Sequence, residues 1–309
     1  MTKMTTRWKY TFATYATVVG IWVVYALLTF FAPDTASSAH FDMHGARRVI
    51  IDLTILIPVH LIWLLAAYGV TTFKSYAIML KGTKEGTGIN LIADGLLVTL
   101  TYFIVTSIYS SIMPYLIHYQ YYDSLAVIRD HLAPLFSLVA FFLLYRGSSL
   151  LRQVTPFSTW TTGTIWALVG YAVFVAAFVF DFATTATGGG PTRSSVDILP
   201  HEILLVTLIL PYVIAWFLGV LACINIVKYA SHVKGKLYRK ALRDLVLGIS
   251  GIAIFVIVIQ LIGFANRYFS NWSLGPILAI LYALIILYGI GFVFVASGAK
   301  KLARIEAVQ

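Results

Sequence analysis

His60 is the residue whose type and position best suit chemistry in this chain of 309 residues. It lies near the middle of a long apolar segment, where an ionisable side chain is costly to bury and by default marks a functional site. Asp52 lies about two turns away in the same segment, at an angular offset of about 80° that disfavours direct contact with His60. His60 would line a path for a solute or ion, or it would be a core histidine bonded to a nearby carbonyl.

Further ionisable residues stand at the ends of other apolar segments. They are Arg129, Asp130, His131, Asp181 and Glu202. With Asp52, they predict a vestibule that gathers ions or solutes on the outer side of a membrane. Solvation at the interface explains the same residues, because long charged side chains at helix ends extend toward water.

The sequence offers no recognisable metal or catalytic constellation. Among the five histidines assigned to the outer side, only His40 and His44 have the i, i+4 spacing, and HExxH, CxxC, GxSxG and glycine-rich phosphate loops are absent. The chain has one cysteine, Cys223, which excludes an intrachain disulfide. Haem needs facing histidines, and only His60 lies deep enough. We therefore expect a protein that is not an enzyme and has no metal or cofactor.

The composition identifies the surroundings of these residues. Hydrophobic residues make up 60% of the chain, charged residues 11%, and the mean hydropathy is +0.88. Soluble domains are roughly 45–50% apolar and about 25% charged. These values exclude a single water-soluble globule and a disordered chain, and they predict a polytopic membrane protein.

The expected fold is an all-α bundle of eight transmembrane helices, because a span needs about 20 mostly apolar residues. The apolar segments lack the alternation of barrel strands. The eight expected spans are Thr11–Ala32, Val49–Phe73, Leu91–Ile117, His131–Arg152, Trp160–Phe182, Ile203–Val227, Leu245–Ala265 and Leu274–Ala296.

The basic residues predict the orientation. One set of connecting and terminal segments holds 17 lysines and arginines, and the opposite set holds 5. The basic set comprises residues 1–10, 74–90, 146–159, 228–244 and 297–309. The positive-inside rule places this set, with both termini, in the cytoplasm. Most of the net charge of +10 thus follows from topology and does not indicate nucleic-acid binding. The 228–244 segment is an ordinary cytoplasmic loop or one that contacts anionic lipid.

An internal duplication is predicted from matches at a fixed offset of 153 residues. Residues 54–70 and 207–223 match at threonine, proline, tryptophan and leucine, and the offset continues without a gap into the following segments. The matched pairs include Trp63 with Trp216, Tyr76 with Tyr229, Lys81 with Lys234 and Gly95 with Gly248. Two four-helix repeats, 1–152 and 153–309, would form one membrane unit, related by a pseudo-two-fold axis along the membrane normal.

Each repeat carries a Thr-x-x-x-Pro pattern that predicts a kinked helix. Pro58 and Pro211 lack an N–H, so the carbonyls of Thr54 and Thr207 lose their helical partners. These positions are interpreted as symmetric hinges, or as kinks that only shape packing. Asp94, four residues after Asn90, is interpreted as a residue of the first turn of its helix, favoured there by the helix dipole.

The segment PYVIAWFLGVLACINIVKYASHVKGKLYRKALRDLVLGISG, residues 211–251, resembles uncharacterised multi-span proteins of candidate-phylum bacteria such as Saccharibacteria. This segment makes up 41 of the 309 residues of the chain. It implies a bacterial inner membrane and carries no catalytic residue.

Two functions are favoured by the sequence. A third, a membrane-embedded enzyme acting on lipid, would require the outer histidines and aspartates to converge. Parallel repeats, kinked helices and His60 favour a transporter of a small solute or ion, with its site between the repeats. The missing catalytic constellation and the basic segment 228–244 favour a membrane sensor, scaffold or complex subunit. The expected partners are the lipid bilayer, a small solute or ion, and a second copy or another membrane protein.

Overall fold

The computed structural model describes the greater part of the chain as α-helix. The described residues are 13–17, 19–21, 23–24, 46–116, 119–154, 165, 168–169, 171–172, 175–176, 210–233, 235–268 and 274–308. Their helices are α2 (Ala46–Met79), α3 (Lys84–Leu116), α4 (Tyr119–Arg152), α7 (Leu210–His232), α8 (Lys236–Tyr268) and α9 (Leu274–Val308). Most residues of the expected spans Thr11–Ala32 and Trp160–Phe182 lie outside the described set.

Several helices extend well beyond their apolar segments. The expected span Leu91–Ile117 lies within α3 except for its last residue, and α3 begins earlier, at Lys84. Most of the predicted loop 228–244 is helical. Lysine, arginine, glutamate and leucine in these stretches are good helix formers, so the helices continue into the polar zone. The turn between α2 and α3 is short. Gly82 takes a positive φ of 91° in this turn. The Thr83 hydroxyl accepts a hydrogen bond from the Gly86 N–H at 2.9 Å, which caps α3.

Among the described residues, four helical segments are long and apolar enough to cross a bilayer. They are His60–Met79, Pro134–Arg152, Leu210–His232 and Ile285–Leu302, and they overlap four of the expected spans. Large apolar side chains are also exposed on the outer faces of the bundle, among them Leu61, Phe142 and Ile286. Such faces are unfavourable in water and fit lipid. The chain is therefore a helical membrane protein.

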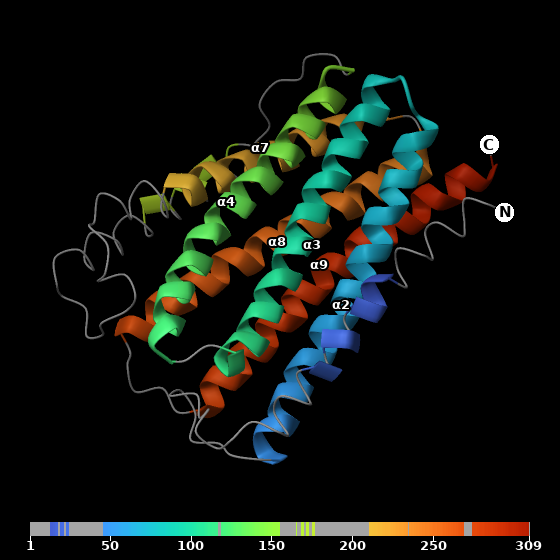
Figure 1. Cartoon of the computed structure of the whole chain (residues 1–309). Helices are drawn as coiled ribbons and strands as arrows, with labels where there is room; N and C mark the ends of the chain where they lie inside the picture. Colours follow the sequence, from blue (N-terminus) through green and yellow to red (C-terminus); the bar gives the residue numbers. More distant parts are fainter. Residues whose placement is uncertain are drawn as a thin grey trace.

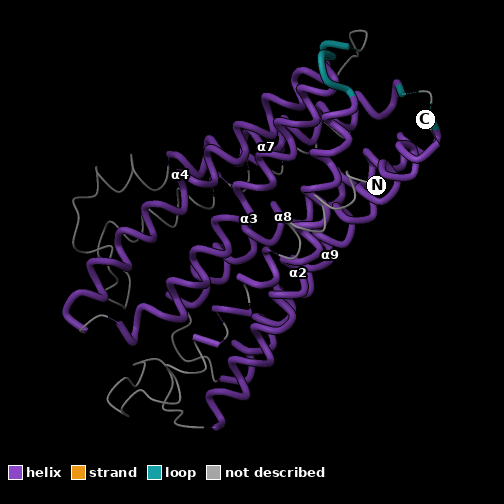
Figure 2. The backbone as a smooth tube through the Cα atoms, turned by 45° about the vertical axis from the view of Figure 1, so that its right-hand side comes forward, coloured by secondary structure: helices purple, strands orange, loops and turns teal. Residues whose placement is uncertain are grey.

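The six helices form a closed ring. The extensive contacts join α2 to α3, α3 to α4, α4 to α7, α7 to α8, α8 to α9, and α9 back to α2. Figures 1 and 2 show α4 and α7 side by side at one edge of the bundle, and α2 and α9 at the opposite edge. The chain order thus gives two three-helix groups that meet along two seams, α4–α7 and α9–α2.

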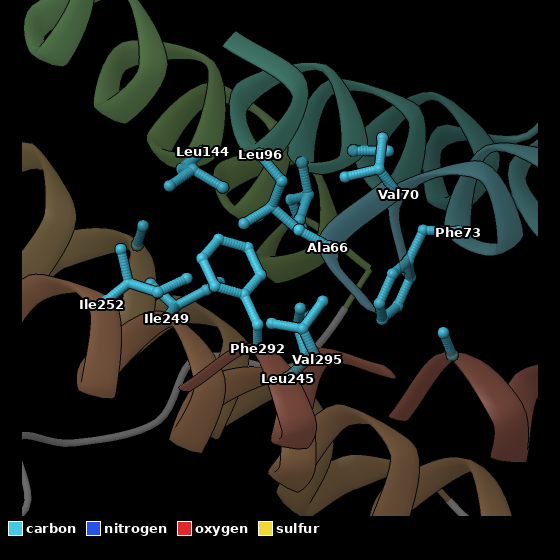
Figure 3. Close-up of a cluster of buried hydrophobic side chains, with 14 of the residues drawn as sticks. Ala66, Val70, Phe73, Leu96, Leu144, Leu245, Ile249, Ile252, Phe292 and Val295 are labelled. Atoms are coloured by element: carbon cyan, nitrogen blue, oxygen red, sulfur yellow. The ribbon is translucent and has the colours of Figure 1, made fainter. Parts of the chain in front are cut away.

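Apolar side chains fill the centre of the ring. Phe292 of α9 is fully buried and lies among side chains of the other helices (Figure 3). The surrounding cluster includes Ala66, Val70, Leu96, Leu144, Leu245, Ile249 and Ile252. The two groups of helices therefore share one hydrophobic core.

Small residues bring α3 and α4 into backbone contact. A Cβ atom placed on Gly147 would lie 2.5 Å from the Gly88 carbonyl oxygen. One placed on Gly95 would lie 2.7 Å from the Ala140 carbonyl oxygen and 2.9 Å from the Leu144 side chain. Only glycine fits such an approach without displacing the neighbouring helix.

The same contacts recur between α8 and α9. A Cβ on Gly298 would lie 2.7 Å from the Ala241 carbonyl oxygen, and one on Gly248 would lie 2.7 Å from that of Gly291 and 2.5 Å from Val295. These contact positions on α8 and α9 match those on α3 and α4. The positions on α8 lie 153 residues after those on α3, and the positions on α9 lie 151 residues after those on α4. The two helix pairs therefore pack in the same register.

Candidate functional site

His60 lies buried on α2, as its central place in an apolar segment predicted. Its ring meets the buried ring of Trp63 edge to face, with centroids 4.6 Å apart and planes at 83°. The indole N–H of Trp63 has no hydrogen-bond partner among the described residues. Both side chains belong to the packed interior of the ring.

The side chains of the other predicted pathway residues lie outside what the structure describes. Arg129, Asp130 and His131 lie on α4, and Asp52 lies on α2, but at these positions the structure describes the backbone alone. Asp181 and Glu202 lie outside the described residues. The vestibule stays a prediction.

The predicted hinges are only partly described. Pro58 lies inside α2, which is continuous from Ala46 to Met79, and the side chain of Thr54 is not described. Pro211 is buried at the second position of α7, and Thr207 lies outside the described residues. A third proline, Pro134, lies inside α4 and escaped the repeat analysis because the second repeat has no counterpart to it.

The interpretation of Asp94 as a first-turn residue is wrong. Because α3 begins at Lys84, Asp94 lies in its third turn. There its carboxylate is 2.5 Å from the Lys74 ammonium of α2 and accepts a hydrogen bond from the Asn90 amide at 3.0 Å. Asp94 therefore joins α2 to α3, and Glu85 is the acidic residue of the first turn.

A cluster of three tyrosines and Glu85 joins four helices at one end of the ring. The Tyr229 hydroxyl of α7 donates to Oε1 of Glu85 on α3 at 2.5 Å, and the Tyr238 hydroxyl of α8 donates to the same oxygen. The two hydroxyls lie 3.3 Å apart. The Tyr76 ring of α2 packs on the Tyr238 ring, with centroids 5.8 Å apart. We call these four residues the tyrosine–glutamate cluster.

The electrostatics of this cluster favour a neutral Tyr238 phenol that donates to the Glu85 carboxyl group. Hydrogen bonds to a charged acceptor are stronger than those between neutral groups. Burial, the neighbouring Tyr229 and the Glu85 carboxylate raise the pKa of Tyr238 far above its ordinary value. Tyr238 therefore remains a hydrogen-bond donor throughout the physiological pH range.

Sequence analysis missed this cluster, although one signal was present. Tyr76 and Tyr229 were matched as repeat equivalents, but Glu85 falls opposite Tyr238 at the same offset. Because a carboxylate and a phenol do not align as similar residues, the pattern drew no attention to Glu85. Its contacts join residues 144 and 153 positions apart, which only the folded chain reveals.

A second polar contact crosses the seam between α4 and α7. The buried Asn225 amide donates to the fully buried Ser148 hydroxyl at 3.4 Å. Arg152 donates to the Asn225 carbonyl oxygen at 3.5 Å. These residues hold the two groups of helices together by hydrogen bonds as well as by apolar packing.

No family model, curated protein or solved structure matches the chain. Among the side chains that the structure describes, no group of three His, Cys, Asp or Glu residues is arranged to hold a metal ion. The function must therefore be argued from the contacts between the helices.

Proposed function

We propose that the chain is a transporter of a small solute or an ion, in which the tyrosine–glutamate cluster closes the inner end. The observation that carries this proposal is that two hydroxyls of the second helix group donate to one carboxylate of the first. The cluster stands where two moving halves of a transporter would meet.

The proposal includes the duplication into residues 1–152 and 153–309, with eight spans. The ring of contacts supports it, because exchanging α2, α3 and α4 for α7, α8 and α9 reproduces the whole ring. The matched glycine contacts support the same register. Under this exchange Tyr76 replaces Tyr229 and Glu85 replaces Tyr238, so the cluster would lie on the pseudo-two-fold axis. Parallel repeats related in this way are a recurrent design of transporters.

We place the protein in a bacterial inner membrane with both termini in the cytoplasm. The turn 80–83, the junction between α7 and α8 and the C-terminal end of α9 lie at one end of the bundle (Figure 1). The described parts of the basic segments 74–90, 228–244 and 297–309 lie at this end, which supports a cytoplasmic position for it. The cluster lies at this end and would act as an inner gate. The role would be non-enzymatic.

The chemistry of the cluster suits a gate that opens reversibly. In the closed state the phenols donate hydrogen bonds to the partly buried carboxylate. If the halves separate, water replaces the same hydrogen bonds, so opening costs far less than leaving a charge unsatisfied. His60 would then line the path from the outer side to the gate.

The packing of the core favours a second candidate, a membrane sensor, scaffold or complex subunit. The side chains around Phe292 come from both helix groups and form continuous apolar contacts (Figure 3). Halves joined in this way would remain fixed, and the cluster would then only stabilise the fold. A measurement of water access distinguishes the two candidates.

The test is thiol labelling at position 60. His60→Cys in a Cys223→Ala background would be placed in sealed vesicles, and a charged impermeant maleimide added on the cytoplasmic side. Combining Tyr229→Phe with Tyr238→Phe removes both bonds to Glu85. We expect this pair to raise the labelling rate at least about tenfold, since bonds to a charged group contribute about 1.5–3 kcal/mol each.

Three comparisons make the result specific. Tyr145→Phe is the matched control, because its hydroxyl has no hydrogen-bond partner within the described part of the chain. Val213→Cys reports the position equivalent to 60, and Ser231→Cys, which is exposed near the inner end, confirms that the reagent works. Continued protection of position 60 in the double variant, with position 231 labelled, would favour the sensor or scaffold.

A further inference from the structure

Three basic residues form a stripe along the first turns of α8. Lys236, Lys240 and Arg243 are all exposed and follow the i, i+4, i+7 spacing of one helix face. The opposite face of α8, with Ala241 and Leu245, is fully buried in the bundle. The stripe therefore points away from the protein.

The stripe lies at the boundary between charged and apolar surface. Leu247 is four residues beyond Arg243 on the same face, and its side chain is 42% exposed. At 1.5 Å per residue, the backbone rises about 6 Å between these two positions. If Leu247 contacts acyl chains, the Arg243 guanidinium lies at the depth of the lipid phosphates.

No described acidic side chain neutralises the stripe. Glu85 accepts hydrogen bonds from tyrosines, and Asp94 is paired with Lys74. Asp244, the nearest in sequence, is paired with Lys301 of α9. The ammonium and guanidinium groups of the stripe are thus left for an anion.

The first half of the chain lacks this charge at the matching positions. Thr83, Thr87 and Asn90 stand where the second half has Lys236, Lys240 and Arg243. This comparison rests on the duplication proposed above, whereas the geometry of the stripe does not. A positive-inside requirement sets the total charge of one side, but it does not explain why the charge is gathered on one face of one half.

We propose that Lys236, Lys240 and Arg243 bind the phosphate headgroups of anionic phospholipids in the inner leaflet. Arginine offers a phosphate two parallel hydrogen bonds, and each lysine adds a compact charge. The position of the stripe favours a lipid over a protein partner, because its Arg243 end adjoins the exposed Leu247 side chain. An acidic protein domain would need a surface clear of the headgroups.

The test measures lipid binding by the full chain in neutral detergent. Native mass spectrometry would follow titrations with phosphatidylglycerol and, separately, with phosphatidylcholine. The variant with Lys236→Thr, Lys240→Thr and Arg243→Asn gives the stripe the residues of the first half. We expect its apparent Kd for phosphatidylglycerol to rise about 100-fold, because each basic residue near an anionic surface contributes about fivefold.

The matched control removes the same charge elsewhere at this end. Lys81, Lys84 and Arg146 are exposed, and the variant with Lys81→Thr, Lys84→Thr and Arg146→Asn should change the Kd less than about threefold. Equal losses in the two variants would show a response to net charge alone and overturn the proposal. Equal binding of the two lipids by the unmodified chain would also overturn it, and would favour an acidic protein partner. Both results are independent of the transport test, which reads position 60.

Discussion

The two seams between the helix groups occupy matching places in the ring of helices but differ in their chemistry. At the α4–α7 seam, Asn225 bonds to Ser148 and Arg152. At the α9–α2 seam, the matching positions hold Thr72 and Ala299, which are both fully buried. The Thr72 hydroxyl donates to the Tyr68 carbonyl of its own helix at 2.8 Å and makes no described bond across the seam.

This contrast separates what builds the fold from what adds specificity. Glycine contacts recur in both helix pairs, so close backbone approach is a shared requirement. Polar contacts are not shared, so each can change without changing the backbone. Hydrogen bonds between membrane helices contribute roughly 0.6 kcal/mol on average. The hydrogen bonds between α4 and α7 therefore fix the relative position of the two helices more than they stabilise the protein. Three pairs of matched substitutions test this separation.

The largest effects are expected at the glycines. Gly147→Ala and Gly298→Ala each place a methyl group within 2.7 Å of a carbonyl oxygen on the facing helix. Both should lower the free energy of unfolding by about 1–3 kcal/mol, since overpacking displaces the neighbouring helix. Thermal unfolding in detergent, compared with the unmodified chain, measures the loss.

Gly20→Ala is the control for this pair, because a Cβ there meets no atom of the described chain within 4 Å. It should leave the unfolding temperature unchanged or slightly raised. If Gly147→Ala destabilises the protein and Gly298→Ala does not, the two halves do not share their packing, and the duplication loses its main structural support.

A smaller difference is expected between the seams themselves. Asn225→Leu removes two hydrogen bonds between α4 and α7, and we expect a loss of about 1 kcal/mol. Thr72→Val removes only a bond within α2, so its effect should stay below about 0.5 kcal/mol. Chemical unfolding in a mixed detergent with a denaturing headgroup compares them. Equal losses at positions 225 and 72 would show that the seams do not differ energetically.

Hydropathy sufficed to predict the all-helical membrane character of the chain, because a run of apolar side chains is read directly from the residues. The fixed offset also matched Trp63 with Trp216, and both are buried. Helix ends were predicted less well. The polar residues before Leu91 predict a loop, which would put Asp94 in a first turn, whereas Lys84 and its neighbours continue the helix.

The polar contacts were largely beyond sequence reasoning. Ser148 and Asn225 are 77 residues apart, and nothing in either segment indicates a partner. His60 attracted attention because an ionisable residue is conspicuous in an apolar run, whereas Glu85 lies among lysines and threonines and appeared ordinary. Its importance comes from the tyrosines that the fold brings to it, which is information held in tertiary contacts.

The smallest difference concerns the two ion pairs between neighbouring helices in the described part of the chain. Asp244 of α8 pairs with Lys301 of α9 and accepts a hydrogen bond from the Ser297 hydroxyl at 2.7 Å, and its side chain is 14% exposed. Asp94 pairs with Lys74, and its side chain is 30% exposed. Solvent screens the more exposed pair more strongly, so Asp244→Asn should cost about 0.5 kcal/mol and Asp94→Asn close to nothing.

Salt sharpens this last comparison, because ions screen exposed charges more than partly buried ones. Raising the salt concentration from about 0.1 M to about 1 M should remove any effect of Asp94→Asn and leave most of that of Asp244→Asn. Unfolding temperatures of the two variants at both concentrations give the result. A larger loss for Asp94→Asn would mean that the α2–α3 contact depends on its charge, and polar contacts would then help to build the first half as glycines do.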